Sequence, residues 1–214
     1  MFSKIFPKIH SEGYKFLVIA VIITVVFYNF SDFLGLVGLV VTIWVYYFFR
    51  DPERVIIEDD SYLVSPADGE IIKVEDVDGP KELGLEGKRF KKISIFMNVF
   101  DCHVNRTPCG GKIEEILYKP GKFFNASLDK ASEDNERNYF KIKDPQNNEV
   151  IVVQIAGLIA RRIVCESHKD QELKQGERIG MIRFGSRADV YYENYEPLVK
   201  VGQRAISGET LLAK

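Results

Sequence analysis

The segment 176–192, GERIGMIRFGSRADVYY, places Gly185 and Ser186 between two apolar runs, and this pair has the most distinctive chemistry in the sequence. One interpretation is a tight turn, because glycine and serine both favour turns. The other is self-cleavage, in which the Ser186 hydroxyl attacks the Gly185 carbonyl carbon and an ester replaces the amide. β-Elimination of that ester gives dehydroalanine, whose hydrolysis releases ammonia and leaves a pyruvoyl group. The pair alone does not decide between the two.

A second polar group lies in the segment 96–111, FMNVFDCHVNRTPCGG, directly after an apolar run that would deliver it to the mouth of a pocket. A hydrogen-bonded turn is the alternative, since Asp, Asn, Pro and Gly form turns. Asp68 in SPADG, at 65–69, has the same ambiguity because Asp-Gly is a good turn dipeptide. The polar residues of the segment 96–111 that concern us are Asp101, His103, Asn105 and Arg106.

Composition and missing motifs exclude several function classes. The 214 residues carry 29 basic and 31 acidic side chains, a net charge of −2, without a basic patch that would hold nucleic acid. No GxGxxG, GxxxxGK(S/T), GxSxG or HExxH motif occurs, which disfavours hydride transfer, nucleotide hydrolysis and zinc proteolysis. Three histidines and three scattered cysteines suggest neither a metal site nor a disulfide framework, so we expect no metal and reduced thiols.

The first fifty residues are typical of a membrane anchor. Two apolar stretches, 16–30 and 33–49, are each near the lower limit of the roughly 17–25 residues that cross a bilayer as helix. Basic residues flank the start of the first stretch and the end of the second, and the short link between the stretches carries only one charged residue, Asp32. This distribution favours a helical hairpin with both ends at the cytoplasmic face of the cell membrane. A shallow re-entrant hairpin remains an alternative, whereas the length of the apolar region disfavours a cleaved signal peptide.

Residues 51–214 predict a catalytic domain that is mainly β. Short runs rich in Val, Ile and Phe are separated by Gly, Pro, Asp and Asn, without a long stretch of helical period. We therefore expect an α+β chain, with a compact antiparallel β-sheet domain preceded by the helical hairpin. The region 126–137 is predicted as a loop, and 160–164 fits a short helix or a strand. The predicted strands are 69–74, 91–97, 111–118, 138–143, 150–156, 178–183 and 188–192.

Several blocks, in this order, resemble the phosphatidylserine decarboxylase proenzymes, particularly their short bacterial and archaeal type. They are SPADG, FDCHVNRTPCGG, PGKFFNASLDKASEDNERN, QIAGLIARRIVC, and GERIGMIRFGSRADVY followed by VKVGQRAISGETLLA. The blocks cover most of residues 65–213. Only the Gly-Ser block and the DCHVNR block are specific individually, but their common order makes coincidence a poor explanation.

The resemblance implies self-cleavage between Gly185 and Ser186, into a β chain of residues 1–185 and an α chain of residues 186–214 that stay associated. The α chain would begin with a covalent pyruvoyl cofactor made from Ser186, an electron sink that forms a Schiff base with the substrate amine. The implied reaction converts a serine-headgroup phospholipid, phosphatidylserine or archaetidylserine, to the ethanolamine phospholipid plus CO2. Some family members are homodimers, and the sequence leaves this open.

The resemblance also assigns roles to single residues. Longer members cleave through an Asp-His-Ser relay, in which Asp68 matches the aspartate. His103 matches the first of their two histidines, which is linked to decarboxylation, and Arg106 stands where the second would be. Either His103 serves both steps or cleavage is assisted differently. Arg187 likewise stands where longer members have threonine.

Substrate contacts are predicted from the chemistry of the lipid. A fork-like arginine suits phosphate and carboxylate, and apolar side chains suit the glycerol side and exclude water from the departing carboxylate. Arg161 and Arg162 are at least as well explained as surface cations, and Phe96 is a further apolar candidate. The substrate-binding residues we select are Arg106, Asn105, Arg137, Phe123 and Phe124.

Two other functions compete with this one. The carboxy-terminal block resembles the strand-turn-strand of lipoyl and biotinyl carrier domains, so a non-enzymatic, membrane-anchored carrier-like or adaptor module is the alternative. Against it, no lysine stands at the exposed turn. A pyruvoyl enzyme for a soluble amino acid is disfavoured by the apolar anchor, since a soluble substrate gives no reason for one.

Overall fold

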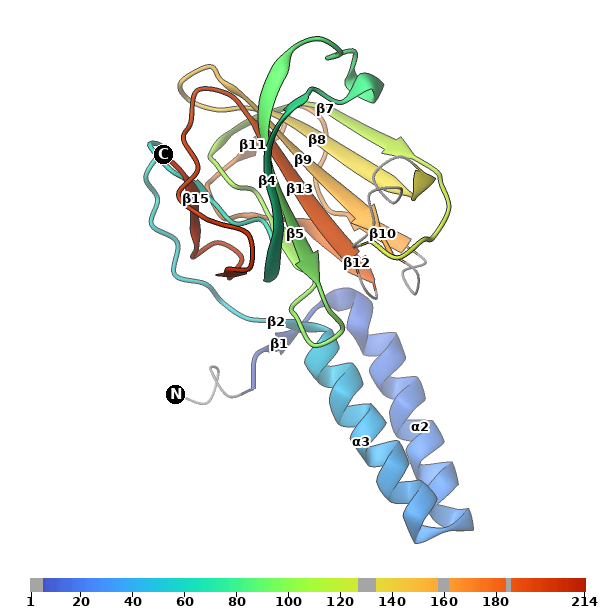
Figure 1. Cartoon of the computed structure of the whole chain (residues 1–214). Coiled ribbons are helices and arrows are strands. Elements are labelled where there is room, and N and C mark those ends of the chain that lie inside the picture. The colour runs from blue at the N-terminus through green and yellow to red at the C-terminus, as the bar shows by residue number, and fades with distance from the viewer. Residues whose placement is uncertain (1–5, 127–133, 158–161, 184–185) are drawn as a thin grey trace. The chain divides into compact units, whose positions relative to one another are not determined.

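The computed structural model describes residues 6–126, 134–157, 162–183 and 186–214. The chain forms two compact units, Met1–Glu53 and Arg54–Lys214 (Figure 1). The division lies close to residue 50, where the change in charge pattern predicts it.

The first unit is a helical hairpin, as the two apolar stretches predict. One helix, Ser11–Phe30 with its first 3-10 turn included, is long and apolar enough to cross a membrane, whereas the following helix is apolar but shorter. Two short strands, one before the first helix and one after the second, pair with each other in antiparallel fashion. The elements are β1 (Lys8–Ile9), η1 (Ser11–Gly13), α2 (Tyr14–Phe30), α3 (Asp32–Phe48) and β2 (Arg50–Asp51).

Small and hydroxylated residues bring α2 and α3 together. Gly38 is buried, and a Cβ atom there would lie only 2.9 Å from Thr24 Oγ1. Thr24 Oγ1 and Thr42 Oγ1 form a hydrogen bond of 2.9 Å between the two helices. Close approach at glycine and hydroxyl bonds across helices are typical of packing inside a bilayer, where apolar burial gives no driving force.

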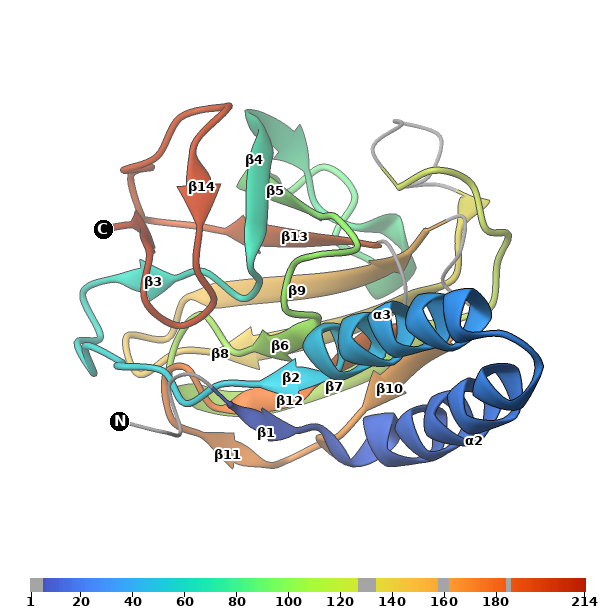
Figure 2. The same ribbon diagram turned by 90° about the horizontal axis from the view of Figure 1, so that it is seen from below.

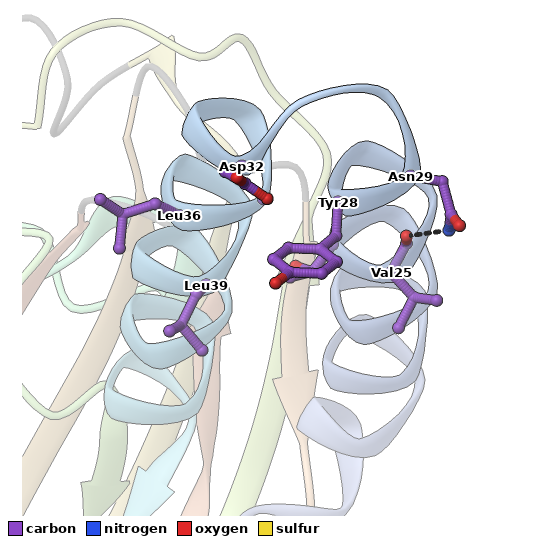
Figure 3. A pocket seen from close by; sticks show the side chains of 8 residues that line it. Val25, Tyr28, Asn29, Asp32, Leu36 and Leu39 are labelled. Carbon is purple, nitrogen blue, oxygen red and sulfur yellow. Dashed lines mark hydrogen bonds between the residues drawn. The ribbon is translucent and has the colours of Figure 1, made fainter.

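A cavity of about 610 Å³ opens between α2 and α3 near the turn that joins them (Figure 3). Its lining is largely apolar, and Asn29 at its rim donates a hydrogen bond to the Val25 carbonyl at 2.7 Å. None of the predicted site residues contributes to the lining. The lining residues are Thr24, Val25, Tyr28, Asn29, Asp32, Gly35, Leu36 and Leu39.

An eight-stranded antiparallel sheet organises the second unit, in the order β11-β7-β8-β9-β13-β5-β4-β14. All seven predicted strands are present, most of them longer than predicted. The sheet strands are β4 (Gly69–Asp78), β5 (Arg89–Met97), β7 (Gly111–Lys119), β8 (Arg137–Lys143), β9 (Glu149–Ala156), β11 (Glu172–Leu173), β13 (Ser186–Tyr192) and β14 (Arg204–Ala205).

Two smaller sheets cover one face of the large one (Figure 2). The first has the order β10-β12-β6 and the second pairs β15 with β3. The ambiguous run 160–164 is a strand over its described part, and the loop prediction for 126–137 lies mostly outside the described residues. These strands are β3 (Leu63–Val64), β6 (Val104–Arg106), β10 (Arg162–Cys165), β12 (Arg178–Arg183) and β15 (Leu211–Ala213).

Alternation along the strands divides the core between the two faces of the large sheet. The main cluster contains Val190 of β13 and Ile95 of β5, and receives Ile182 from the covering sheet. The opposite face carries a smaller cluster around Tyr139 and Ile155, against which the partly buried leucines of the segment 80–85 pack. Both faces of β13 are therefore removed from water.

Candidate active site

Ser186 is the first residue of β13, the strand that lies between β9 and β5. In the register it lies opposite Ala156 on one side and Met97 on the other. Its side chain is fully buried, and its Oγ contacts the Met97 sulfur at 3.7 Å. A central strand thus holds this hydroxyl in the interior of the domain, away from bulk solvent.

A chain of three buried amides lies on the same face of the sheet as Ser186. Asn138 Nδ2 donates to Gln154 Oε1 at 3.3 Å, and Gln154 Nε2 donates to Asn105 Oδ1 at 2.9 Å. Asn105 Nδ2 in turn contacts the Met97 sulfur at 3.6 Å, the atom that also contacts Ser186. All three amides are at most 2% exposed. Because buried polar groups need partners, this network fixes each amide in one orientation.

His103 directly precedes β6 and is fully buried. Its Nδ1 lies 3.0 Å from the Asp101 carbonyl oxygen, and its own carbonyl accepts a hydrogen bond from the Ile182 backbone. The Asp101 carboxylate is also buried and is contacted by Arg204 and by the Asn98 backbone N–H. Hydrogen bonds therefore hold the block DCHVNR both at Asp101 and at the His103 backbone, and the buried imidazole is restricted in orientation.

Asp68 is nine-tenths buried and receives three hydrogen bonds. Arg54 Nη2 donates to both of its carboxylate oxygens, at 2.8 and 2.7 Å, and the Ser207 backbone N–H donates at 2.8 Å. Within the described residues Asp68 and His103 share no hydrogen bond. Gly69, which follows, has φ +158°, and a Cβ there would collide with the Phe96 carbonyl, so the SPADG turn requires glycine.

The structure separates the two arginines predicted to bind substrate. Asn105 and Arg106 lie on β6, and Arg106 Nη1 donates to the Gly176 carbonyl at 2.9 Å. Arg137 begins β8 and faces the other side of the large sheet from the amide of Asn138. There it lies 3.3 Å from Glu82. Burial alone would raise the pKa of Glu82, but the hydrogen bond from Lys119 and the nearby cations outweigh it and lower the pKa, so Glu82 is ionised.

The two predicted phenylalanines differ in their surroundings. Phe123 is partly buried against the main core, whereas Phe124 is 41% exposed. Asn135 accepts a hydrogen bond from the Phe124 N–H and donates to the carbonyls of Phe124 and Ala156. Since Ala156 lies opposite Ser186 in the sheet, this asparagine ties the Phe124 loop to the strand next to the serine.

Two predicted residues, Gly185 and Arg161, lie outside the described residues, and Arg162 is exposed. Several contributors were not predicted at all. Asn138 and Gln154 sit at strand positions that alternation assigns to the core, and a polar residue at such a position is the signal that could have found them. Arg54 gave no such signal, because its partner is fourteen residues away and set by tertiary structure.

The geometry defines a mainly β domain with a buried polar site built around a serine at the start of a central strand. The model of the phosphatidylserine decarboxylase family matches residues 41–213. The chain is 78% identical over its 214 residues to the phosphatidylserine decarboxylase proenzyme of Pelagibacter ubique, with all of both chains covered. It is 54% identical over 205 residues to the proenzyme of Ruegeria pomeroyi, covering 95% of this chain and 94% of that one.

The chain therefore belongs to the phosphatidylserine decarboxylase family. It is accordingly an enzyme of the carboxy-lyase class, and the adaptor alternative is set aside. The resemblance seen in the sequence blocks is confirmed.

Proposed function

We propose that this chain is a proenzyme that cuts itself between Gly185 and Ser186 and then decarboxylates phosphatidylserine to phosphatidylethanolamine and CO2. The observation that carries the proposal is the position of Ser186, a buried serine after glycine at the first residue of a central strand, in a chain 78% identical to a protein named as a proenzyme. The names of the relatives favour phosphatidylserine over the ether lipid archaetidylserine as substrate.

The residues around Ser186 fit a pyruvoyl group. The Ser186 side chain is fully buried, and Asn105 offers an amide donor beside Met97 on the side of the sheet that Ser186 faces. The group supplies a carbonyl that accepts the electron pair released when CO2 leaves. Exclusion of water by the surrounding side chains favours loss of charge from the carboxylate. We assign to His103 the movement of protons at this site, because its imidazole is buried and held by the Asp101 carbonyl.

Asp68 remains our candidate for orienting His103 during self-cleavage. Its present partners are Arg54 and Ser207, so this role requires the carboxylate to exchange one of them for the imidazole. Such an exchange is chemically reasonable because an aspartate has two oxygens and accepts several hydrogen bonds at once.

For the substrate we propose Arg106 and Asn105 near the phosphate and carboxylate, and Phe124 as the apolar contact for the glycerol side of the lipid. Phe124 is exposed and tied to the strand beside Ser186, which supports this assignment. Phe123 packs against the core, so we expect it to shape the loop. Arg137 lies on the other face of the sheet, and we propose for it at most an indirect contribution. If alanine at Phe123 and Phe124 left lipid turnover unchanged, the apolar assignment would be wrong.

The helical hairpin is proposed as the anchor that holds the enzyme at the cytoplasmic face of the membrane. Helix Ser11–Phe30 meets the length and composition of a membrane span, and basic residues flank the hairpin at its outer ends. A lipid substrate accounts for such an anchor, because the reaction then occurs where the substrate is concentrated. Whether the hairpin crosses the bilayer or lies shallow within it, the headgroup chemistry is the same.

Intact mass spectrometry of the purified full-length chain beside Ser186→Ala tests the proposal. We expect a 29-residue fragment, 186–214, with a blocked amino terminus in the wild type and an uncut chain in the variant, which lacks the attacking hydroxyl. Incubation of the processed protein with phosphatidylserine vesicles should then release CO2. A folded wild-type protein in detergent that stays uncut would overturn the proposal.

A further inference from the structure

Arg187 and Asp189 form an ion pair inside the domain, directly after the cleavage serine. Arg187 Nε donates to Asp189 Oδ1 and Nη2 donates to Oδ2, both at 2.6 Å, so the contact is bidentate. Arg187 is fully buried and Asp189 is 1% exposed. A charged pair so completely withdrawn from water is rare, because each ion loses its hydration.

The pair lies on the opposite face of β13 from Ser186 Oγ, because successive side chains of a strand alternate. Arg187 is held in the register between Ile155 of β9 and Phe96 of β5. Asp189, two residues further along, lines a cavity of about 380 Å³ together with Tyr139 and Tyr191. Burial first, and then the negative charge of Asp189, raise the pKa of Tyr191, so its phenol stays neutral and adds no second negative charge beside the guanidinium.

Stability is a weak reason to place an ion pair here. Two apolar residues of similar volume usually stabilise a buried position as well as a buried pair does. A role in positioning Ser186 is a stronger reason, because cleavage turns Ser186 from a residue inside the chain into a chain end. Chain ends fray unless they are tied down. A guanidinium fixed to a carboxylate two residues deeper braces the first residues of β13 in extended form.

We propose that Arg187 and Asp189 are positioning residues for self-cleavage, an inference that rests on the proposed function. In the first step the Oγ–C bond to Gly185 forms, the C–N bond breaks, and the hydroxyl proton passes to the nitrogen. In the second step a base removes the Ser186 α proton and the Gly185 carboxylate leaves. Water then hydrolyses the resulting dehydroalanine at its α carbon. The α nitrogen departs as ammonia and the pyruvoyl carbonyl remains. The pair holds Ser186 through these steps, so that elimination outruns simple hydrolysis of the ester.

The test is the double variant Arg187→Met, Asp189→Leu in the full-length chain, which removes both charges and keeps the buried volume. Its melting temperature should equal or exceed that of the wild type. We expect the appearance of the α chain to slow at least tenfold. We also expect part of the α chain to begin with serine instead of pyruvoyl, since water now hydrolyses the ester before elimination. A purely structural role would not change that ratio.

Two further variants keep the test decisive. Arg187→Lys retains the charge but not the two-point contact, and it should give an intermediate rate even if the double variant folds poorly. Tyr191→Phe, on the same strand and face, should process as the wild type does. Wild-type rate and complete pyruvoyl formation in both pair variants would overturn the inference and leave the proposed function intact. A wild-type chain that stays uncut would instead overturn the proposed function, and this inference with it.

Discussion

The amide of Gln154 connects Asn138 with Asn105, and Asn105 shares the Met97 sulfur with Ser186. An amide side chain can flip between two orientations, so its orientation is set by its partners. Gln154 donates to Asn105 Oδ1, so the Asn105 NH₂ is directed at the Met97 sulfur and the Pro66 carbonyl. If Ser186 is the cleavage residue, we therefore expect its chemistry to depend on Gln154, which is linked to it through Asn105 and Met97.

Replacing Gln154 with methionine should slow self-cleavage while costing about 1–3 kcal/mol of stability, the usual penalty for leaving buried polar groups without partners. The rate of α-chain appearance and the urea midpoint measure the two effects. Val152→Ala, on the same face of β9, loses packing without disturbing the amides. If both variants slow cleavage in proportion to their loss of stability, the amide chain has no role beyond folding.

Asp68 can be separated from its cation by a pair of variants. Asp68→Asn should abolish or strongly slow self-cleavage if the carboxylate orients His103. Arg54→Met removes the partner seen in the structure and should lower the free energy of unfolding by about 1–3 kcal/mol, yet the chain should still cut itself. Time courses of cleavage by gel electrophoresis at a temperature where both variants are folded provide the comparison. Full activity of Asp68→Asn would exclude the relay.

At this scale the sequence predicts side chains whose chemistry is local. Ser186 follows glycine, and His103 lies in a dense polar block, so both stand out. The partners of Asp68 do not, because Arg54 and Ser207 come from distant segments. For Arg187 and Asp189 the sequence pattern suggests the wrong environment. Their alternation with Ala188 and Val190 suggests a solvent face, but the cluster around Tyr139 and the segment 80–85 cover that face.

Among the elements, β13 has the most consequential position. Its seven residues pair with β9 on one side and with β5 on the other. The rest of the carboxy-terminal segment adds β14 against β4 and β15 against β3. After cleavage, the strands that pair with β13, β14 and β15 would belong to the β chain, while Ala213 of β15 also bridges Pro197 within the α chain.

The α chain should therefore remain bound after cleavage without a covalent link. Under native conditions in detergent, both fragments should elute together in size-exclusion chromatography and should separate only in denaturant. The mixing of a labelled 186–214 peptide with processed protein offers a control, because a strand held on both sides should not exchange within hours. Early dissociation of the α chain under native conditions would contradict the arrangement.

Glu149 at the start of β9 forms ion pairs with Lys88 at 2.8 Å and with Lys141 at 2.9 Å. Burial alone would raise the pKa of Glu149, but the two lysine hydrogen bonds outweigh it and lower the pKa. A carboxyl whose pKa is lower in the folded state than in the unfolded state stabilises the fold at pH values above its unfolded pKa of about 4.3. This stabilisation is lost as the pH falls through the pKa of the folded state.

Glu149→Gln should thus destabilise the protein at pH 7, by about 0.5–1 kcal/mol because Lys88 is 40% exposed. The difference from the wild type should shrink steadily below pH 4.5. Denaturant unfolding at several pH values measures it, with Glu70→Gln on the exposed side of β4 as a control. A difference that stays constant down to pH 3 would mean that the lysine contacts contribute nothing.

The strands themselves were predictable because each is a short run of apolar and β-branched residues between turn formers. Their order was not, since neighbours such as β13 and β9 are separated by some thirty residues and pair only through tertiary structure. β6 escaped prediction because Asn and Arg in VNR resemble a turn. The Asn105 side chain joins the buried amide chain near Ser186, which explains why a strand there departs from the usual pattern.

For the whole molecule, the division after Glu53 separates the helical hairpin from the residues that we propose for the chemistry. The second unit has its own core on both faces of its sheet, and it contains Ser186, His103, Asp68 and the amide chain. The first unit contains two apolar helices whose side chains are mostly exposed, which is tolerable in lipid and costly in water. Folding and self-cleavage should accordingly belong to one unit and access to substrate to the other.

A chain of residues 54–214 should therefore fold, cut itself and turn over a short-chain, soluble phosphatidylserine within about threefold of the full-length rate. Its turnover of phosphatidylserine in vesicles should fall by about tenfold or more, because an anchored enzyme meets its substrate at a high effective concentration. Parallel assays on the soluble lipid and on vesicles, with the full-length protein reconstituted in the same vesicles, give the two ratios. Equal vesicle turnover by both chains would show that the hairpin has another task, and failure of the shorter chain to cut itself would show that the hairpin contributes to the site.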